Sequence, residues 1–319
     1  MPPIPKFAAL VAVGPKPQEI DRVADLVASI AAFEHGPSYF VMVDDAKADR
    51  KLTEQIKFPI NMSPVSVWHD RSTQKAGYTK GKGICSVILT GLQWIARYAE
   101  DAQFVLKLDS DALVIAPFAN KIFVKLSENP AIGMIGAYTL TPNGTPRDIS
   151  RNAAIMKNLH KPAIPWLKPR KAYRAIRDRA TGGALKDIRA ALTTARKQGY
   201  AYGEHCLGGG YALSHEFVRR METQGHLKNP LQWLSVDSPE DVMIGMYTAA
   251  VGLKHANFVG DNEVFGVRHE GLPYEPAELV SRGYSVIHSI KNDKRISERE
   301  VRAYFAARRL SAASHRNEL

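Results

Sequence analysis

Short apolar runs and stretches of helical periodicity alternate from the start of the chain. The first run, Phe7–Val13, is rich in Val, Leu and Ala and stops at a Gly-Pro-Lys-Pro sequence, which is typical of a buried strand that ends in a loop. Ile20, Val23, Val27 and Ile30 then recur at the spacing of one helix face. The pattern therefore predicts a strand, a loop and a helix.

The same alternation continues along the next part of the chain. Tyr39–Val43 and Val65–Trp68 predict two more strands, and Ile84–Tyr98 predicts a helix that precedes the strongly apolar strand Phe104–Leu108. Strands that alternate with helices indicate an α/β fold with a doubly wound sheet. Ligands of such sheets bind at the carboxyl ends of the strands, so residues that follow a strand are the first candidates for a site.

The pattern changes between about residues 142 and 203, where a Pro-rich stretch precedes a basic segment of helical character, Arg170–Lys197. We interpret this region as an insertion. Further elements are predicted at Leu207–Met221 (strand, then helix), Val236–Val251 (helix), Tyr284–Ile290 (strand) and Glu298–Leu310 (amphipathic helix). We expect a single domain over residues 1–295 and a C-terminal helix and tail over residues 296–319.

Composition and cysteine content narrow the class of protein. A chain of 319 residues with 45% hydrophobic content is long enough to enclose a cleft. Its two cysteines, Cys85 and Cys206, are too few for a disulfide framework and suit a reducing compartment. The sequence shows neither a signal-peptide pattern nor an apolar run of bilayer-spanning length, so we expect a soluble, cytoplasmic protein.

The net charge of +11 predicts an anionic partner. Part of this charge lies between Lys168 and Lys197, and it suits a nucleotide diphosphate, an acidic glycan or the headgroups of an anionic inner membrane on which the protein lies peripherally. Nucleic acid is not expected, because the chain has no nucleic-acid-binding motif and no basic run interleaved with stacking aromatic residues.

The first chemical signal is Asp109-Ser110-Asp111, directly after the predicted strand Phe104–Leu108. Two carboxylates one residue apart can both reach a hard cation such as Mn²⁺ or Mg²⁺, whose open positions then take phosphate oxygens. An isolated Asp-x-Asp more often marks a solvated turn. The position at the end of a buried strand favours the metal-binding interpretation.

Two further signals follow in the second half of the chain. Gly208-Gly209-Gly210 precedes a short apolar strand, and such glycines let a backbone approach a ligand closely, although they are also typical of a plain turn. Glu240-Asp241 opens an apolar helix, where an acidic pair by itself is explained by capping of the helix N-terminus.

The order of these motifs resembles a known family, the β-1,3-glycosyltransferases that include the Fringe and core-1 galactosyltransferase enzymes. The segments that carry the resemblance are Gly91–Ile95, Lys107–Asp111, Gly208–Ser214, Pro239–Gly245 and His288. The resemblance implies a GT-A fold, a Rossmann-like mixed sheet flanked by helices, with a UDP-sugar as donor. It also implies a Mn²⁺ site formed by Asp109, Asp111 and His288, with Asp241 as the base that deprotonates the acceptor hydroxyl and Glu240 as the second candidate for that base.

The residues support the same chemistry without the family. Displacing a diphosphate from an anomeric carbon needs a cation at the leaving oxygen and a carboxylate at the attacking hydroxyl, and one base with one metal implies inversion. Further donor contacts are assigned to Asp44, Asp45, Lys80, Lys82, Asp109, Ser110, Gly209, Gly210 and Lys291. For the lysines the alternative is an ordinary exposed side chain, and for His288 it is a strand residue with a hydrogen-bond partner.

We therefore expect an inverting, metal-dependent hexosyltransferase that transfers sugar to a hydroxyl of a glycan or glycolipid. Ser110 stands where the family often has an aspartate, and the missing membrane anchor and paired cysteines point to a bacterial-type cytoplasmic enzyme of polysaccharide biosynthesis. Two alternatives remain at this point: a retaining transferase or nucleotidyltransferase of the same fold, and a non-catalytic glycan-binding protein. The sugar, the linkage and the oligomeric state do not follow from the sequence.

Overall fold

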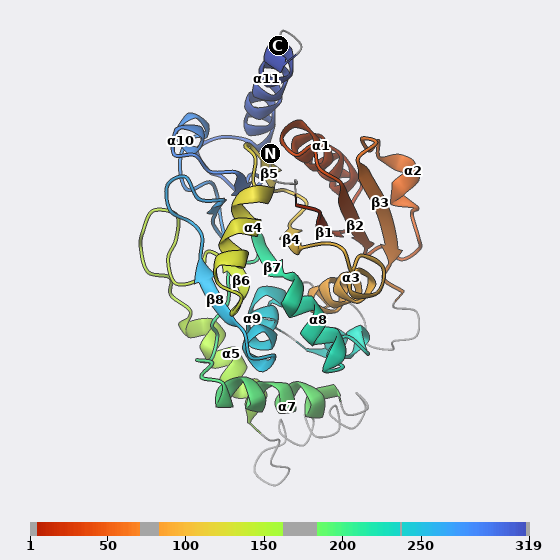
Figure 1. Ribbon diagram of the computed structural model, residues 1–319, viewed down its shortest axis with the longest axis vertical. Coiled ribbons are helices and arrows are strands. Elements are labelled where there is room, and N and C mark those ends of the chain that lie inside the picture. The colour runs from red at the N-terminus through yellow and green to blue at the C-terminus, as the bar shows by residue number, and fades with distance from the viewer. Residues whose placement is uncertain (1–4, 71–82, 162–183, 237, 317–319) are drawn as a thin grey trace.

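A computed structural model describes residues 5–70, 83–161, 184–236 and 238–316 (Figure 1). Lys80, Lys82 and the basic residues from Lys168 to Arg179 lie outside these ranges. Among the described helices, none combines the length and the apolar character needed to cross a membrane.

The first half of the chain contains most of the elements that the periodicity predicts. Its observed elements are β1 (Phe7–Val13), α1 (Gln18–Phe33), β2 (Ser38–Asp44), α2 (Leu52–Gln55), β3 (Met62–Trp68), α3 (Ile84–Tyr98), β4 (Phe104–Leu108), β5 (Leu113–Val114), α4 (Ala119–Glu128) and β6 (Ile132–Gly136). The predicted strands at β1 and β4 and the predicted helix at α3 have the observed bounds. The short elements α2, α4, β5 and β6 were not predicted from the sequence, and β6 is also interrupted by glycine.

The second half begins with helices of the predicted insertion. Its elements are α5 (Ser150–His160), α7 (Ala184–Lys197), β7 (Gly210–Ser214), α8 (His215–Thr223), the 3₁₀-helix η1 (Pro230–Ser235), α9 (Glu240–Ala250), β8 (Lys254–Asn257), β9 (Phe265–Val267), α10 (Pro276–Ser281), β10 (Val286–His288) and α11 (Glu298–Arg316). The predicted helix Arg170–Lys197 is described only as α7, and β10 is shorter than predicted. The short strands β8 and β9 and the helix α10 were not predicted.

Seven strands form the main sheet in the order β3-β2-β1-β4-β7-β6-β8. Neighbouring strands pair in parallel except β7, which is antiparallel to both β4 and β6. The sheet is therefore mixed but mostly parallel, in agreement with the predicted α/β class. Because β7 runs backwards, its first residue, Gly210, pairs with Leu108 at the carboxyl end of β4.

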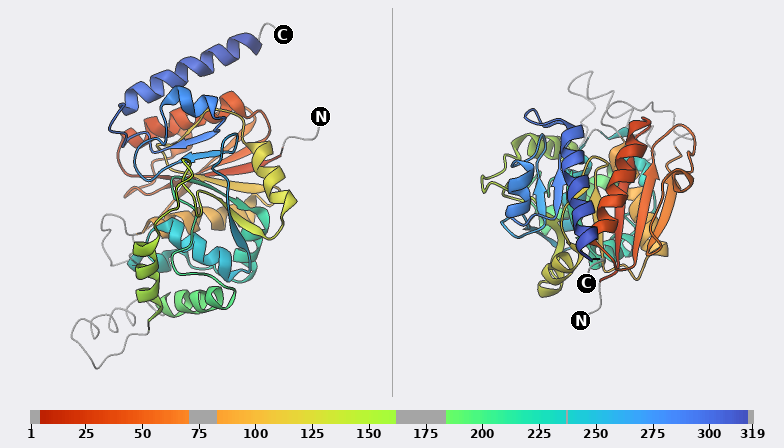
Figure 2. Two further views of the ribbon diagram at one scale, coloured as in Figure 1. Left: turned by 90° about the vertical axis from the view of Figure 1, so that its left-hand side faces the viewer. Right: turned by 90° about the horizontal axis from the view of Figure 1, so that it is seen from above.

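Both faces of the main sheet are covered, so its strands are apolar on both sides. In β1, Phe7, Ala9 and Val11 pack towards α1 and α4, while Ala8 and Leu10 pack towards α3 and the helices beyond. Figure 2 shows α1 and α11 on one side of the sheet, and α8 and α9 on the other with α7 further out. The helix α7 buries Ile188 and Leu192 in the same cluster as α9, so this part of the insertion belongs to the core.

A second sheet has three strands in the order β5-β10-β9. Here β5 follows the Asp109–Asp111 turn directly and pairs with β10 in antiparallel register, with Leu113 opposite Ile287. A cluster of Leu113, Ile287, Val301 and other apolar residues holds this sheet against α10 and α11. The small sheet thus joins the end of β4 to the last part of the chain.

Candidate functional site

The pairing of β5 with β10 brings His288 to the Asp109–Asp111 turn. The Nε2 atom of His288 lies 3.4 Å from Oδ2 of Asp109 and 3.3 Å from Oδ1 of Asp111. One ligand atom from each of these residues lies within 4.8 Å of the others, and this is the one such group found among the described residues. Two carboxylates and an imidazole around a small space form a suitable donor set for a divalent cation.

A hydrogen bond to a backbone carbonyl orients the ring of His288. Its Nδ1–H donates to the carbonyl of Arg268 at 2.9 Å, which leaves Nε2 facing the two carboxylates. Carbonyl partners of this kind fix the orientation of metal-binding imidazoles. Burial lowers the pKa of His288, but hydrogen bonds and charges from Asp109 and Asp111 outweigh this effect and raise that pKa to about 9.

The two aspartates keep their charge although they are in a buried site. Burial raises the pKa of each, but the charge of Lys107 and the contacts with His288 hold the pKa of Asp109 well below its usual range. For Asp111, the contacts with His288 and the charge of Lys291 have the same result. The side chain of Asp109 is 38% exposed and that of Asp111 is buried, so a ligand would approach from the Asp109 side.

Lys291 and Ser289 hold Asp111 from the strand end of β10. The ammonium of Lys291 lies 3.0 Å from Oδ1 of Asp111, and the hydroxyl of Ser289 donates to Oδ2 at 3.0 Å. The side chain of Lys291 is 35% exposed. The lysine predicted to contact phosphate is therefore at the turn, where it can exchange its carboxylate partner for another anion.

Two residues of the glycine run, Gly208 and Gly209, have no room for a side chain in this packing. A Cβ on Gly209 would lie 2.0 Å from Nδ1 of His288, and one on Gly208 would lie 2.7 Å from Oε1 of Glu240. Gly210 has only ordinary contacts. Gly208 and Gly209 thus allow close approach of the backbone to the acidic pair and to the histidine.

Glu240 and Asp241 start α9 beside the same glycines. The backbone N–H of Gly208 donates to Oδ2 of Asp241 at 2.9 Å, and the N–H of Val242 donates to Oδ1 at 2.8 Å. Asp241 thus accepts from a backbone N–H in the first turn of its own helix, as the capping interpretation predicts. It also accepts from the backbone of the glycine run. Burial raises the pKa of both carboxyl groups, although Lys107 opposes the shift in each.

His205 lies beside Asp241 and bonds to Arg147. His205 donates from Nδ1 to the carbonyl of Gly203 at 2.6 Å and accepts from Arg147 at Nε2 at 2.7 Å, while Nε2 lies 3.5 Å from Oδ2 of Asp241. Burial and the charge of Arg147 lower the pKa of His205 to about 4. A neutral histidine and a buried guanidinium therefore lie behind the carboxylate.

The other residues predicted to contact the donor, where they are described, bond to protein side chains. Ser110 donates its hydroxyl to Glu19 at the start of α1. Asp44 is fully buried, and Arg50 holds its Oδ1 at 2.6 Å, so Asp44 offers no exposed oxygen to a nucleotide. Asp45 is 5% exposed and accepts from Nδ1 of His69 at 3.2 Å. Lys80 and Lys82 are outside the described residues.

Sequence reasoning missed three residues of this site. Lys107 lies within the Lys107–Asp111 motif but has no predicted role. A lysine inside the apolar run Phe104–Leu108 nevertheless indicates a buried charge with a partner. His205 and Arg147 have no predicted role. Neither of these two has a distinctive local pattern, because only the fold brings them to Asp241.

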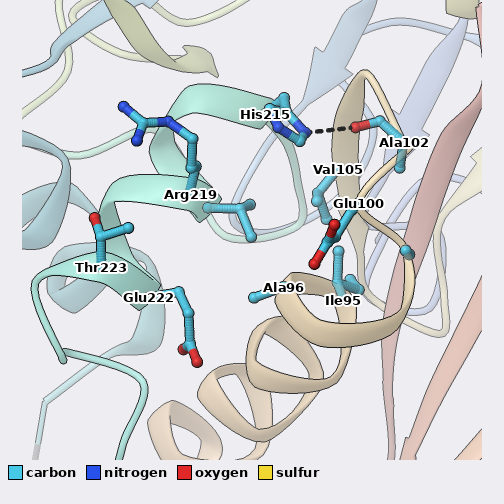
Figure 3. Close-up of a pocket in the computed structure, with 11 residues that line it drawn as sticks. Ile95, Ala96, Glu100, Ala102, Val105, His215, Arg219, Glu222 and Thr223 are labelled. Carbon is cyan, nitrogen blue, oxygen red and sulfur yellow. Dashed lines mark hydrogen bonds between the residues drawn. The ribbon is translucent and has the colours of Figure 1, made fainter.

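A separate cavity of about 360 Å³ lies between α3 and α8. Figure 3 shows its lining, where His215 donates to the carbonyl of Ala102 at 3.0 Å. Ala102 and Val105 lie at the opposite end of β4 from Asp109. None of the residues assigned to the candidate site lines this cavity.

Comparison with protein families gives one match. The family model described as galactosyltransferase matches residues 86–259, more than half of the 319 residues. The matched region contains Asp109, Asp111, the glycine run and the acidic pair of α9, and it ends before His288. A search of curated proteins finds no match.

Proposed function

The chain belongs to the galactosyltransferase family, and we propose that it is an inverting GT-A enzyme that moves a sugar from a UDP-sugar to a hydroxyl of a glycan or glycolipid. Family membership makes it a hexosyltransferase with a sugar donor and an acceptor. The mostly parallel seven-stranded sheet with covering helices is consistent with the GT-A fold. We retain a single catalytic domain over residues 1–295 as part of this proposal.

One observation carries the proposal more than any other. Two groups with different chemistry, the Asp109–Asp111–His288 cluster and the Glu240–Asp241 pair, lie on either side of the glycine run at the carboxyl end of β4. Displacement of a diphosphate needs such a division between a group that binds the leaving oxygens and a carboxylate that accepts a proton.

Asp109, Asp111 and His288 would hold a divalent cation. When bound, the cation would supply positive charge to the leaving diphosphate. The imidazole in the donor set favours Mn²⁺ over Mg²⁺, which prefers oxygen ligands. Lys291 would add a positive charge for the phosphates by leaving Asp111, since its side chain is already partly exposed.

We assign the base to Asp241 rather than Glu240. An ion pair of 2.8 Å with Lys107 neutralises Glu240, and hydrogen bonds from backbone N–H groups hold Asp241 in one orientation. A raised pKa makes the Asp241 carboxylate a stronger proton acceptor. A hydroxyl activated by one carboxylate on the face opposite the leaving group gives inversion at the anomeric carbon.

Calorimetric titration with UDP, GDP, CDP and dTDP, each with Mn²⁺ and with EDTA, tests the donor site. We expect Mn²⁺-dependent binding of UDP alone. Asp111→Ala should abolish this binding, whereas Asp241→Asn should bind UDP like the wild type and lose turnover. Binding of no nucleotide would support a non-catalytic protein, and full transfer by Asp241→Asn would refute the base assignment.

The stereochemistry of the product tests the reaction type. An inverting enzyme converts an α-linked donor into a β-linked product, which proton NMR of the isolated glycoside distinguishes by the anomeric coupling. An α-linked product would favour a retaining transferase instead.

A further inference from the structure

Lys107 is a buried charge in the middle of the main sheet. It is the fourth residue of β4, between Leu106 and Leu108, and is 1% exposed. Its side chain points to the face covered by α9, opposite to that of its apolar neighbours in the strand. Lysines are almost never fully buried unless they are paired, because burial of a lone ammonium is very costly.

Every donor of this ammonium has an acceptor. Its Nζ atom lies 2.6 Å from Oδ1 of Asp109 and 2.8 Å from Oε1 of Glu240, and it also donates to the carbonyl of Gly208. An ammonium has three N–H donors, so its hydrogen-bonding capacity is used in full. Asp109 belongs to the cluster with Asp111 and His288, and Glu240 belongs to the acidic pair of α9. The ammonium of Lys107 therefore connects these two groups.

The two oxygens of Asp109 have different partners. Lys107 binds Oδ1, while Oδ2 faces Nε2 of His288 at 3.4 Å. The lysine therefore sets the rotation of the carboxylate that directs Oδ2 to the candidate metal position. Lys291 has the corresponding place at Asp111, but its side chain is 35% exposed and can leave, whereas Lys107 is enclosed.

Resting on the function proposed above, we propose that Lys107 is a positioning residue that joins the metal-binding carboxylate Asp109 to the acidic pair of α9. It orients Asp109 towards the cation and pairs with Glu240, which leaves Asp241 to accept the proton. The same contacts fix the separation between the carboxylates at the leaving group and at the acceptor. Glu240 and Lys107 are 133 residues apart, so this contact also ties the start of α9 to β4.

A set of three variants, Lys107→Met, Glu240→Met and the double variant, tests this role by Mn²⁺ titration and thermal unfolding. Lys107→Met should lower the unfolding temperature, because it leaves Glu240 buried without its partner. It should also weaken Mn²⁺ binding by about 10–100-fold, the usual loss when a partner that orients a metal ligand is removed.

The double variant separates positioning from a merely structural role. Two apolar side chains of similar length often replace a buried ion pair without loss of stability, so the unfolding temperature should return towards that of the wild type. Mn²⁺ affinity should stay as low as in Lys107→Met, since Asp109 still lacks its partner. Glu240→Met alone should bind Mn²⁺ nearly as the wild type does.

Lys121→Met is the matched control. Lys121 also donates from its ammonium to backbone carbonyls, those of Asn262 and Gly283, and it lies outside the site. Its variant should keep the Mn²⁺ affinity of the wild type. The inference fails if the double variant, or Lys107→Met, binds Mn²⁺ like the wild type. If the wild-type chain itself binds no Mn²⁺, the proposed function fails first, and the inference with it.

Discussion

At the residue scale, the candidate site depends on glycines without a Cβ atom as well as on charged side chains. Gly209 lies against the imidazole of His288, and Nδ1 of the same ring donates to the carbonyl of Arg268. The ring cannot retreat without losing that bond. A single methyl group at position 209 would therefore have to displace either the ring or the loop.

We expect Gly209→Ala to abolish or strongly weaken Mn²⁺ binding, because its Cβ would lie 2.0 Å from Nδ1 of His288. Titration calorimetry with Mn²⁺ measures the effect, and circular dichroism checks the fold. Gly260→Ala is the control. Its Cβ would come no closer than 3.2 Å to another atom, Oε2 of Glu263, which is the end of a flexible side chain. Wild-type Mn²⁺ affinity in Gly209→Ala would mean that the loop adapts and that this close approach is not required.

At the element scale, α11 supports the small sheet that carries His288. Val301 and Phe305 pack in one cluster with Ile287, which directly precedes the histidine, and with Ile290, two residues after it. Ion pairs tie the same helix to α1, with Arg22 at 2.6 Å from Glu298 and Arg302 at 2.5 Å from Asp25. The predicted amphipathic helix at Glu298–Leu310 is confirmed, and it extends to Arg316.

Phe305→Ala should lower the free energy of unfolding by about 3–5 kcal/mol, the usual cost of removing a buried phenyl ring from a core. Phe305 is 2% exposed. Urea unfolding followed by tryptophan fluorescence measures the change. Ile60→Ala, at a fully exposed position, should leave the free energy of unfolding unchanged. A small effect at Phe305 would show that α11 adds little to the stability of the domain.

At the scale of the whole molecule, the buried His205 and the half-buried His255 connect stability to pH. Burial is the main cause that lowers the pKa of both His205 and His255 to about 4. Their ordinary pKa in an unfolded chain is about 6.5. The unfolded state therefore takes up protons first, so the stability from these groups is complete above about pH 6.5 and is lost as the pH falls towards 4.

His255→Phe should reduce the loss of stability between pH 6.5 and pH 4, by on the order of 3 kcal/mol. Phenylalanine keeps the ring that stacks on Tyr138, although it loses the hydrogen bond to the carbonyl of Gly245. Urea unfolding across this pH range measures the slope. The exposed His269→Phe serves as the control. An unchanged slope in His255→Phe would exclude a contribution from this histidine.

The net charge of +11 also belongs to this scale. We predict that the chain floats with vesicles containing anionic phospholipid, does not float with neutral vesicles, and is released at high salt, because screening weakens such attraction. A cytoplasmic location and peripheral contact with an inner membrane are hypotheses from the sequence, and flotation tests the second of them. Equal flotation with both kinds of vesicle, or with neither, would exclude an electrostatic membrane contact.

The sequence by itself determined the local elements and much of the candidate chemistry. Apolar periodicity is a property of neighbouring residues, so β1, α3 and β4 could be predicted closely from it. Asp109 and Asp111 share one turn directly after an apolar strand, and this position together with their spacing predicted a joint role. The order of the motifs along the chain then indicated the family that the comparison confirms.

Only the tertiary structure decided which distant residues meet. The pairing of β5 with β10 brings His288 to Asp109, and the contact of Lys107 with Glu240 joins residues 133 positions apart. Reversal of β7 places the glycine run beside both groups. Such contacts depend on strand order, direction and register, which are set by burial of the whole core. No local pattern in the sequence contains that information, and this is why Lys107, Arg147 and His205 had no assigned role before the fold was known.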